Sequence, residues 1–222
     1  MENQMETIGN ILPQLPPRTV RRGTEKKLPP SAPKLSAQRR TWPSGMQVDR
    51  KRIPKYRIET VAGLLAENVW PVYFYGESGR GKSFMAALIY AEWPNVIRQD
   101  IGTIDYDREP KFLKSSDVLG EIADARFRNN GVRKLRDMIQ MASLVVLDDI
   151  ADRAATDARR AALYDVLEWR KVQPMILTGN FGPDELLDIL KDDRIVDRIQ
   201  AGRQIKFSGP SMRLSGLPII EV

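Results

Sequence analysis

Residues 72–83 read VYFYGESGRGKS, an apolar run that leads directly into the pattern Gly-x-x-x-x-Gly-Lys-Ser. Glycines at positions 76, 79 and 81 allow the backbone to approach a ligand closely, so that backbone N–H groups converge on an anion. The apolar helix expected after the loop would direct its positive dipole end to the same point. The stretch therefore predicts a strand, a phosphate-binding loop and a helix, in that order.

The residue types in this loop have separate roles in binding a nucleoside triphosphate. Lys82 is expected to reach the β- and γ-phosphates, and the Ser83 hydroxyl to ligate the metal. We therefore predict ATP and Mg²⁺ as bound cofactors; the alternative is a glycine-rich turn without a ligand. The predicted nucleotide-binding residues of the loop are Gly76, Glu77, Ser78, Gly79, Arg80, Gly81, Lys82 and Ser83.

Composition limits the chemistry that this 222-residue chain can perform. It contains no cysteine and no histidine, which excludes disulfides, thiolate or imidazole metal sites, and Ser-His or Cys-His nucleophile pairs. Catalysis would have to use carboxylates, lysine, arginine and an oxygen-bound metal. Since no apolar run approaches the roughly 20 residues of a membrane span, and no signal pattern is seen, we expect a soluble cytoplasmic protein with no membrane partner.

The net charge of +6 is unevenly distributed. Residues 1–57 hold 13 Lys and Arg but 4 Asp and Glu, and they also contain eight of the 15 prolines. Such a segment buries too little apolar surface to offset its ordering entropy, so residues 1–56 are predicted to be a flexible basic arm. It suits a polyanion or folding on a partner; the alternative is a solvated linker. Apolar residues at helical spacing near residues 5–15 suggest a short partner-docking helix.

From residue 57 the pattern alternates between helices and strands, which predicts one α/β domain with a mostly parallel sheet covered on both faces. The expected order is helix 58–68, strand 72–75, helix 82–92, strand 96–98, a loop or hairpin over 102–110, strand 111–114, helix 115–127, helix 132–141, strand 143–147, helix 156–171, strand 175–178, helices 183–190 and 194–201, and strand 204–207.

Two strands end in polar side chains that complete a candidate catalytic site. The apolar run at 144–147 is followed by Asp148 and Asp149, and carboxyl ends of strands in open parallel sheets are where ligands bind. Asp148 is expected to anchor Mg²⁺ through its water shell, and Asp149 to orient the attacking water. Asn180, after the strand at 175–178, would hydrogen-bond that water or the γ-phosphate. The alternatives are a buried strand with polar capping residues and an ordinary loop asparagine.

Three arginines are further candidates for contact with phosphates. Arg194 and Arg198 lie one helical turn apart, on one face of a predicted helix. Either this face is exposed and forms salt bridges with Asp193 and Asp197, or one arginine reaches a neighbouring subunit's γ-phosphate as a catalytic finger. Arg213 is a further cationic candidate.

These motifs, in this order, resemble those of the AAA+ ATPases of the DnaC/DnaI helicase-loader and IstB transposition-helper group. The similarity runs from about residue 56 to residue 214. The resemblance implies a P-loop AAA+ ATPase core over residues 57–222, preceded by the flexible basic arm. The segments that carry it are GESGRGKS, SSDVLGEIADAR, LRDMIQMASLVVLDDI, PMILTGN, RIVDR and SMRL.

The resemblance also implies roles for individual residues. In this group, the residues matching Lys82, Ser83 and Asp148 bind nucleotide and Mg²⁺, and the match to Asn180 is the first sensor. Many members have Asp-Glu where this chain has Asp-Asp, so the carboxylate at Asp149 is one methylene shorter, and slow hydrolysis is expected.

The arginines also have counterparts in the group. The residue matching Arg198, with Arg194 close by, is a finger that acts on a neighbouring subunit, which implies a homo-oligomer. Arg213 resembles the final sensor arginine.

The function that we predict is ATP-dependent loading of a replicative helicase onto single-stranded DNA, with the arm contacting the helicase. One alternative is an IstB-like helper of a transposase that binds duplex DNA. Another is a nucleotide-gated scaffold or a small-molecule kinase. A basic cluster, for which the alternative is a solvated helix face, is the candidate DNA contact: Arg126, Arg128, Arg133, Lys134 and Arg136.

Overall fold

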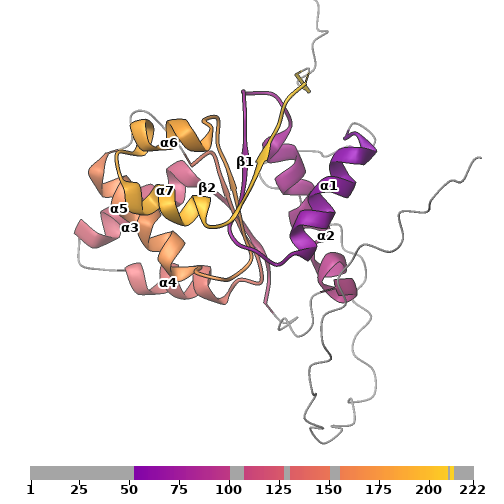
Figure 1. Ribbon diagram of the computed structural model, residues 1–222. Coiled ribbons are helices and arrows are strands. Elements are labelled where there is room, and N and C mark those ends of the chain that lie inside the picture. Colours follow the sequence, from indigo (N-terminus) through magenta and orange to yellow (C-terminus); the bar gives the residue numbers. More distant parts are fainter. Residues whose placement is uncertain (1–52, 101–107, 128–130, 151–155, 210, 213–222) are drawn as a thin grey trace, which may run out of the picture. The chain divides into compact units, whose positions relative to one another are not determined.

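The computed structural model describes residues 53–100, 108–127, 131–150, 156–209 and 211–212, with side chains except for 94–100 and 127. Helices and strands alternate through these ranges (Figure 1). The elements are α1 (Lys55–Ala66), β1 (Val72–Tyr75), α2 (Lys82–Asp100), β2 (Lys111–Lys114), α3 (Ser115–Phe127), α4 (Val132–Met141), β3 (Val145–Asp148), α5 (Asp157–Trp169), β4 (Met175–Thr178), α6 (Pro183–Leu190), α7 (Asp193–Gln200) and β5 (Arg203–Lys206).

The five strands form one sheet in the order β2-β3-β4-β1-β5, and every neighbouring pair is parallel. β1 therefore lies between β4 and β5, with Val72 opposite both Ile176 and Arg203. In a parallel sheet all strands end at the same edge, so the loop after β1 shares that edge with the ends of β3 and β4. This architecture confirms the predicted α/β class with a parallel sheet flanked by helices.

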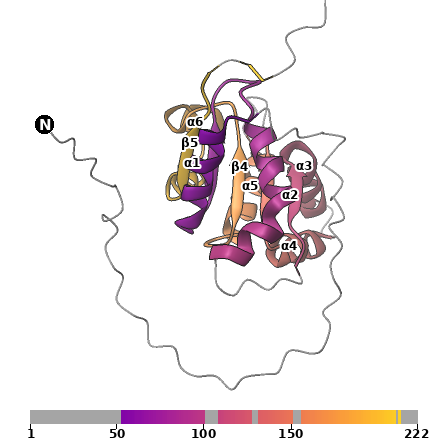
Figure 2. The same cartoon turned by 90° about the vertical axis from the view of Figure 1, so that its right-hand side faces the viewer.

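Side chains alternate between the two faces of the sheet, and each face has its own helical cover. Val72 and Phe74 of β1 pack into a core with α1 and α2, whereas Tyr73 packs into a core with helices α3 to α7. Figure 1 shows these two layers on opposite sides of the strands, and Figure 2 shows α1 and α2 in front of the sheet. The three inner strands β3, β4 and β1 are buried on both faces, which is why they read as apolar runs, whereas the edge strands β2 and β5 are more exposed.

One predicted element is wrong. Residues 96–98 were expected to form a strand after a helix ending at Glu92, but α2 continues without a break to Asp100. Pro94 has no N–H group, so the helix loses one hydrogen bond at this point. The helix can nevertheless continue, because extending an existing helix avoids the cost of nucleating a new one. β2 holds the edge position beside β3. The strands at 72–75, 111–114 and 175–178 and the helices at 115–127, 132–141 and 183–190 are confirmed at their predicted bounds.

Residues 1–52 of the predicted arm, with the suggested docking helix near residues 5–15, lie outside the described residues. Its last residues are described and are not part of a flexible segment, because Ile53 is buried against α1 and α2 and α1 begins at Lys55. The loop expected over 102–110 is described only from residue 108. Within the described ranges, no helix has the length and apolar character of a membrane span.

Candidate active site

The loop after β1 is a tight turn built on glycines. Gly76, Gly79 and Gly81 have φ angles of 130°, 80° and 89°, a region that other residues rarely adopt. At Gly76 a Cβ atom would also lie 2.3 Å from the carbonyl oxygen of Phe207. α2 begins directly after the loop, so its first N–H groups and positive dipole end face the space that the loop encloses.

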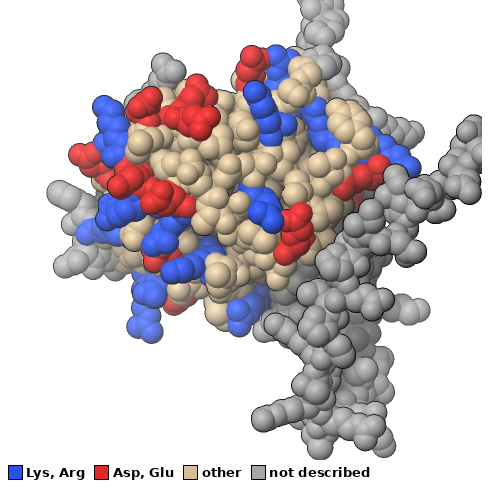
Figure 3. Space-filling view, in the orientation of Figure 1, with Lys and Arg blue, Asp and Glu red and all other residues tan. Residues whose placement is uncertain are grey.

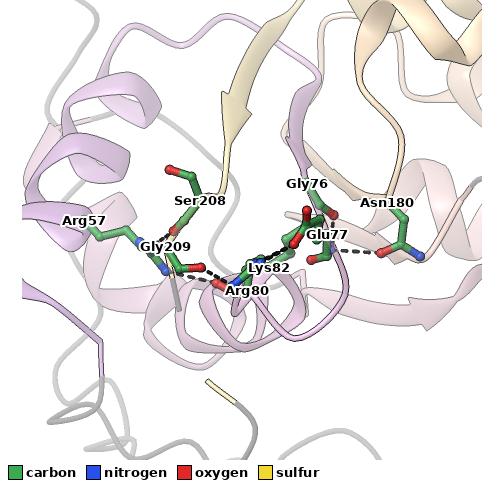
Figure 4. Close-up of polar contacts among 8 residues, drawn as sticks. All are labelled: Arg57, Gly76, Glu77, Arg80, Lys82, Asn180, Ser208 and Gly209. Carbon is green, nitrogen blue, oxygen red and sulfur yellow. Dashed lines mark hydrogen bonds and ion pairs between the residues drawn. The ribbon is translucent and has the colours of Figure 1, made fainter. Parts of the chain in front are cut away.

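Lys82 is buried, and its side chain reaches back to the first residues of the loop (Figure 4). Its Nζ donates to the carbonyl oxygens of Gly76 at 2.6 Å and Glu77 at 2.8 Å, and to Asn180 Oδ1 at 3.0 Å. These three acceptors orient the ammonium group toward the start of the loop and the end of β4. The Lys82–Asn180 contact joins the loop after β1 to the end of β4.

Thr178 positions the two aspartates at the end of β3, one through its carboxylate and the other through its backbone. Its Oγ1 donates to Asp148 Oδ1 at 2.6 Å and accepts from the Asp149 backbone N–H at 2.9 Å. Asp149 has a φ of 62°, the left-handed conformation that costs an L-residue about 1 kcal/mol or more. Ser115 Oγ donates to the Asp149 carbonyl oxygen. Thr178 and Ser115 thus stabilise a strained backbone next to the metal-binding candidate.

These groups surround a cavity of about 410 Å³ at the carboxyl edge of the sheet. Asn180 Nδ2 approaches Asp149 Oδ1 to 3.5 Å across it. Side chains from three strand ends and from the start of α2 therefore meet in one space. The cavity is lined by Ser78, Gly79, Gly81, Lys82, Ser83, Phe84, Asp148, Asp149, Thr178, Asn180 and Met212.

The donor set fits a metal that is bound together with phosphates. No group of three or more carboxylates that could hold a metal ion is found among the residues that the structure describes. Mg²⁺ commonly uses one or two protein oxygens, keeps waters and takes its other ligands from substrate phosphates. Ser83 and Asp148, which both line the cavity, match that pattern.

Three of the predicted loop residues do not line the cavity. Gly76 contributes its carbonyl oxygen to Lys82, as described above. Arg80 donates through Nε to Glu77 Oε2 at 3.1 Å and through Nη1 to the Gly209 carbonyl oxygen, so its guanidinium is engaged beside the loop. The hydrogen bond and charge of Arg80 lower the pKa of Glu77. Arg80 and Glu77 therefore shape the loop.

Arg194 and Arg198 lie elsewhere, at a second cavity of about 570 Å³. Their guanidinium carbons stand 4.8 and 5.1 Å from the centre of the Tyr164 ring. Arg194 pairs with Asp192 at 2.8 Å, and Arg198 with Glu168. The predicted pairing partners Asp193 and Asp197 are thus not the ones used by the side-chain ion pairs. Within one chain these arginines do not line the loop's cavity, and Arg213 lies outside the described residues.

Sequence reasoning missed Thr178 and Met212 as parts of the site. Thr178 is a polar residue at the last position of a buried strand, one residue before Gly179-Asn180, which was a usable signal. Met212 gave no chemical signal; its backbone N–H donates to the Gly79 carbonyl oxygen at 2.6 Å. A Cβ on Gly81 would lie 2.3 Å from the Met212 sulfur.

The predicted basic cluster lies over α3 and α4, where Figure 3 shows Lys and Arg side chains gathering at the lower left. Arg126, Arg133, Lys134 and Arg136 are exposed, and Arg128 lies outside the described residues. Arg126 forms an ion pair with Asp165, and Arg133 approaches Asp137 to 4.0 Å. The surface combines exposed positive charge with local carboxylate partners.

Comparison with known proteins gave similarity in structure only. No protein-family model matches the sequence, and no curated protein matches it significantly. The crystal structure of DnaI superposes with a TM-score of 0.53 at 20% identity, covering 75% of this chain and 88% of that one. The DnaC helicase loader gives 0.54 at 14% identity, with 74% and 95% covered. DnaA bound to AMPPCP and single-stranded DNA gives 0.55 at 16%, with 75% and 53% covered.

These similarities confirm the resemblance inferred from sequence at the level of the fold: the chain has the P-loop fold of AAA+ ATPases such as DnaI and DnaC. The chain spans about half the length of two AMPPCP-bound DnaA structures that it matches, but most of the DnaI and DnaC structures.

Proposed function

We propose that the protein is a Mg²⁺-dependent ATPase of DNA replication that loads a replicative helicase onto single-stranded DNA. The observation that carries the ATPase part is the convergence of Lys82, Ser83, Asp148, Asp149 and Asn180 on one cavity at the sheet edge. The cavity has positive groups on one side, namely the N–H groups of the loop, the N-terminal end of α2 and the Lys82 ammonium. The carboxylates of Asp148 and Asp149 also line it. This arrangement suits a metal–polyphosphate complex, whose negative charge the loop accepts and whose metal the carboxylates attract.

Each residue then has a defined task. Lys82 and the loop N–H groups hold the phosphates, and Ser83 and Asp148 hold Mg²⁺, which would neutralise charge developing on the transferred phosphoryl group. Asp149 is proposed to orient a water molecule and accept its proton, and Asn180 to hydrogen-bond that water or the γ-phosphate.

Arg194 and Arg198 are proposed to act on a neighbouring subunit's nucleotide. They line a cavity other than the one beside their own phosphate loop, so the γ-phosphate that they contact would belong to a second copy of the chain. Arg198 would exchange its contacts with Glu168 and Tyr164 for that phosphate. The shared site makes hydrolysis dependent on assembly.

The loader function draws support from the match to most of the DnaI and DnaC helicase-loader structures, whereas DnaA is matched over half of its length. The exposed basic residues of α3 and α4 are proposed to contact DNA phosphates, which predicts binding that weakens steeply with salt. The basic arm is proposed to contact the helicase.

Phosphate release from Mg²⁺-ATP tests the ATPase. We expect turnover by the wild type, none with EDTA, and none with Lys82→Ala, whereas Lys55→Ala, in an exposed lysine of α1, should match the wild type. Equal turnover by Lys82→Ala and the wild type would disprove the assigned site. Mixing the Arg198→Ala and Lys82→Ala variants tests the shared site: turnover should recover in the mixture, because one variant keeps the phosphate loop and the other keeps the arginine. Full activity of Arg198→Ala alone would indicate a site contained within one subunit.

Assembly assays separate the loader from the transposase helper. Purified protein, its host's replicative helicase and single-stranded DNA should form a complex that depends on ATP and on Lys82. Binding to duplex DNA in preference to single strands, with stimulation of strand transfer by a transposase, would instead establish the helper function.

A further inference from the structure

The segment that follows β5 lies across the phosphate loop. We call residues 207–209 and 211–212 the strap. The strap meets the loop at three places: the Phe207 carbonyl beside Gly76, the Gly209 carbonyl bonded by Arg80, and the Met212 N–H bonded to the Gly79 carbonyl oxygen at 2.6 Å. Two of these contacts use backbone on both sides, so they do not depend on a matching pair of side chains.

Arg57, on α1, fastens the strap to the loop. Its Nη1 donates to the Arg80 carbonyl oxygen at 3.0 Å and contacts the Met212 sulfur at 3.6 Å, while its Nη2 donates to the Ser208 carbonyl oxygen at 2.9 Å. Figure 4 shows the side chain reaching from α1 into the gap between the two segments. The guanidinium also stacks 5.1 Å from the centre of the Phe207 ring. Its planar fork serves both segments at once, which a lysine ammonium on its flexible stem does less well.

These contacts bear on the phosphate-binding N–H groups themselves. A trans peptide carries its C=O and N–H on opposite sides, so holding the carbonyls of Gly79 and Arg80 fixes the directions of the Arg80 and Gly81 N–H groups. The donors of a phosphate loop are such N–H groups. Arg57 itself does not line the cavity, and therefore acts on the ligand only through the loop.

We infer that Arg57 is a positioning residue that couples nucleotide binding to the fastening of the strap. The inference rests on the proposed nucleotide site and extends it: the fastened strap keeps the loop in its phosphate-binding form, and by reciprocity a bound nucleotide holds the strap down. The contacts that hold the strap therefore depend on whether the site contains a nucleotide.

The test uses the full-length protein, a fluorescent ADP analogue and amide hydrogen exchange. In the wild type, nucleotide should slow exchange in a peptide that covers residues 207–212. Arg57→Ala should weaken binding of the analogue about tenfold and remove most of this slowing, with Arg57→Lys intermediate, since allosteric coupling is typically 5- to 150-fold. Lys55→Ala, on the same helix, is the matched control and should behave as the wild type. Arg57→Gln, which keeps part of the stem and one donor group, replaces Arg57→Ala if the latter does not fold.

The outcomes separate the two proposals. If the wild type binds the analogue but its strap exchange does not respond, or if the Arg57 variants bind it as tightly as the wild type, the coupling is disproved and the nucleotide site stands. If the wild type binds no nucleotide, both proposals are overturned. Equal thermal midpoints of Arg57→Ala and the wild type, together with weakened binding, would separate positioning from a general loss of stability.

Discussion

Replacing Thr178 by valine is expected to damage both the stability and the metal response of the protein. The side chain is 1% exposed, and its hydroxyl both donates to Asp148 Oδ1 and accepts from the Asp149 N–H. Valine has nearly the same shape but can do neither. The Asp149 backbone, already in a left-handed conformation, would lose the hydrogen bond of its N–H group, and Asp148 would lose the donor that sets its orientation.

The size of the effect follows from these two hydrogen bonds. An unsatisfied N–H costs about 1–3 kcal/mol, and a hydrogen bond to a carboxylate contributes about 1.5–3 kcal/mol, part of which water recovers because Asp148 is only half-buried. We therefore expect a loss of about 3 kcal/mol in the free energy of unfolding. For a domain of this size that is roughly 6–12 °C in the midpoint of thermal unfolding. Loss of a residue that orients a metal ligand typically costs about 10- to 100-fold in metal affinity or activity.

Thermal unfolding and a Mg²⁺ titration of ATP turnover measure the two effects. Thr178→Ser, which keeps the hydroxyl and loses a methyl group, is the matched control and should stay within about 1 kcal/mol of the wild type with an unchanged Mg²⁺ requirement. If the valine and serine variants share one midpoint and one Mg²⁺ requirement, the Thr178 hydroxyl does not position Asp148 and the Asp149 backbone.

Three further outcomes are expected. Gly81→Ala should abolish binding of a fluorescent nucleotide, because Gly81 has a φ of 89° and a Cβ there would clash with the Met212 sulfur. The control Gly63→Ala, where a Cβ on α1 meets no atom, should bind normally and raise the free energy of unfolding in denaturant by about 0.5–1 kcal/mol. Burial lowers the pKa of Arg170 to about 10, so its guanidinium stays charged at neutral pH, where it donates to carbonyl oxygens at the end of α4 and before β4. Arg170→Met should therefore lower the free energy of unfolding, measured in denaturant, by about 3 kcal/mol. A loss below about 1 kcal/mol would contradict this role. Asp192 caps α7, and a hydrogen bond from the side chain of Arg194 lowers the pKa of its carboxyl group. The ionised carboxylate should therefore stabilise the fold fully above its unfolded pKa of about 3.9, and this stabilisation should disappear as pH falls through the lower pKa of the folded state. Asp192→Asn should lack this pH dependence in acid-unfolding curves.

Most of the fold was predictable because its elements depend on neighbouring residues. The strand at 72–75, the glycine turn and the start of α2 all follow from one twelve-residue stretch. Prediction failed after Glu92: the helix was expected to end there and residues 96–98 to form a strand, but α2 continues through Pro94 to Asp100. A proline inside a helix removes one hydrogen bond, a cost that a helix already nucleated can bear.

The candidate site was predictable in its chemical groups and less so in their arrangement. Asp148, Asp149 and Asn180 were identified because each follows an apolar strand, and the parallel sheet brings them to the cavity beside Lys82. Arg194 and Arg198 were identified as a pair on one face, but their partners were not: Asp192 is the N-cap residue of α7, and Glu168 and the Tyr164 ring come from the packing of α7 against α5.

By itself, the sequence determined that this chain builds a phosphate loop between a buried strand and a helix, because glycine at positive φ and an adjacent lysine are local requirements. Only the tertiary structure decided what that loop touches. β3 and β4 pair side by side, which places Thr178 against Asp148 and Asp149 across 29 or 30 residues of chain. α1 and the segment after β5 meet over the loop, which places Arg57 against Ser208. Contacts of this kind depend on strand order and helix packing, and no stretch of neighbouring residues specifies them.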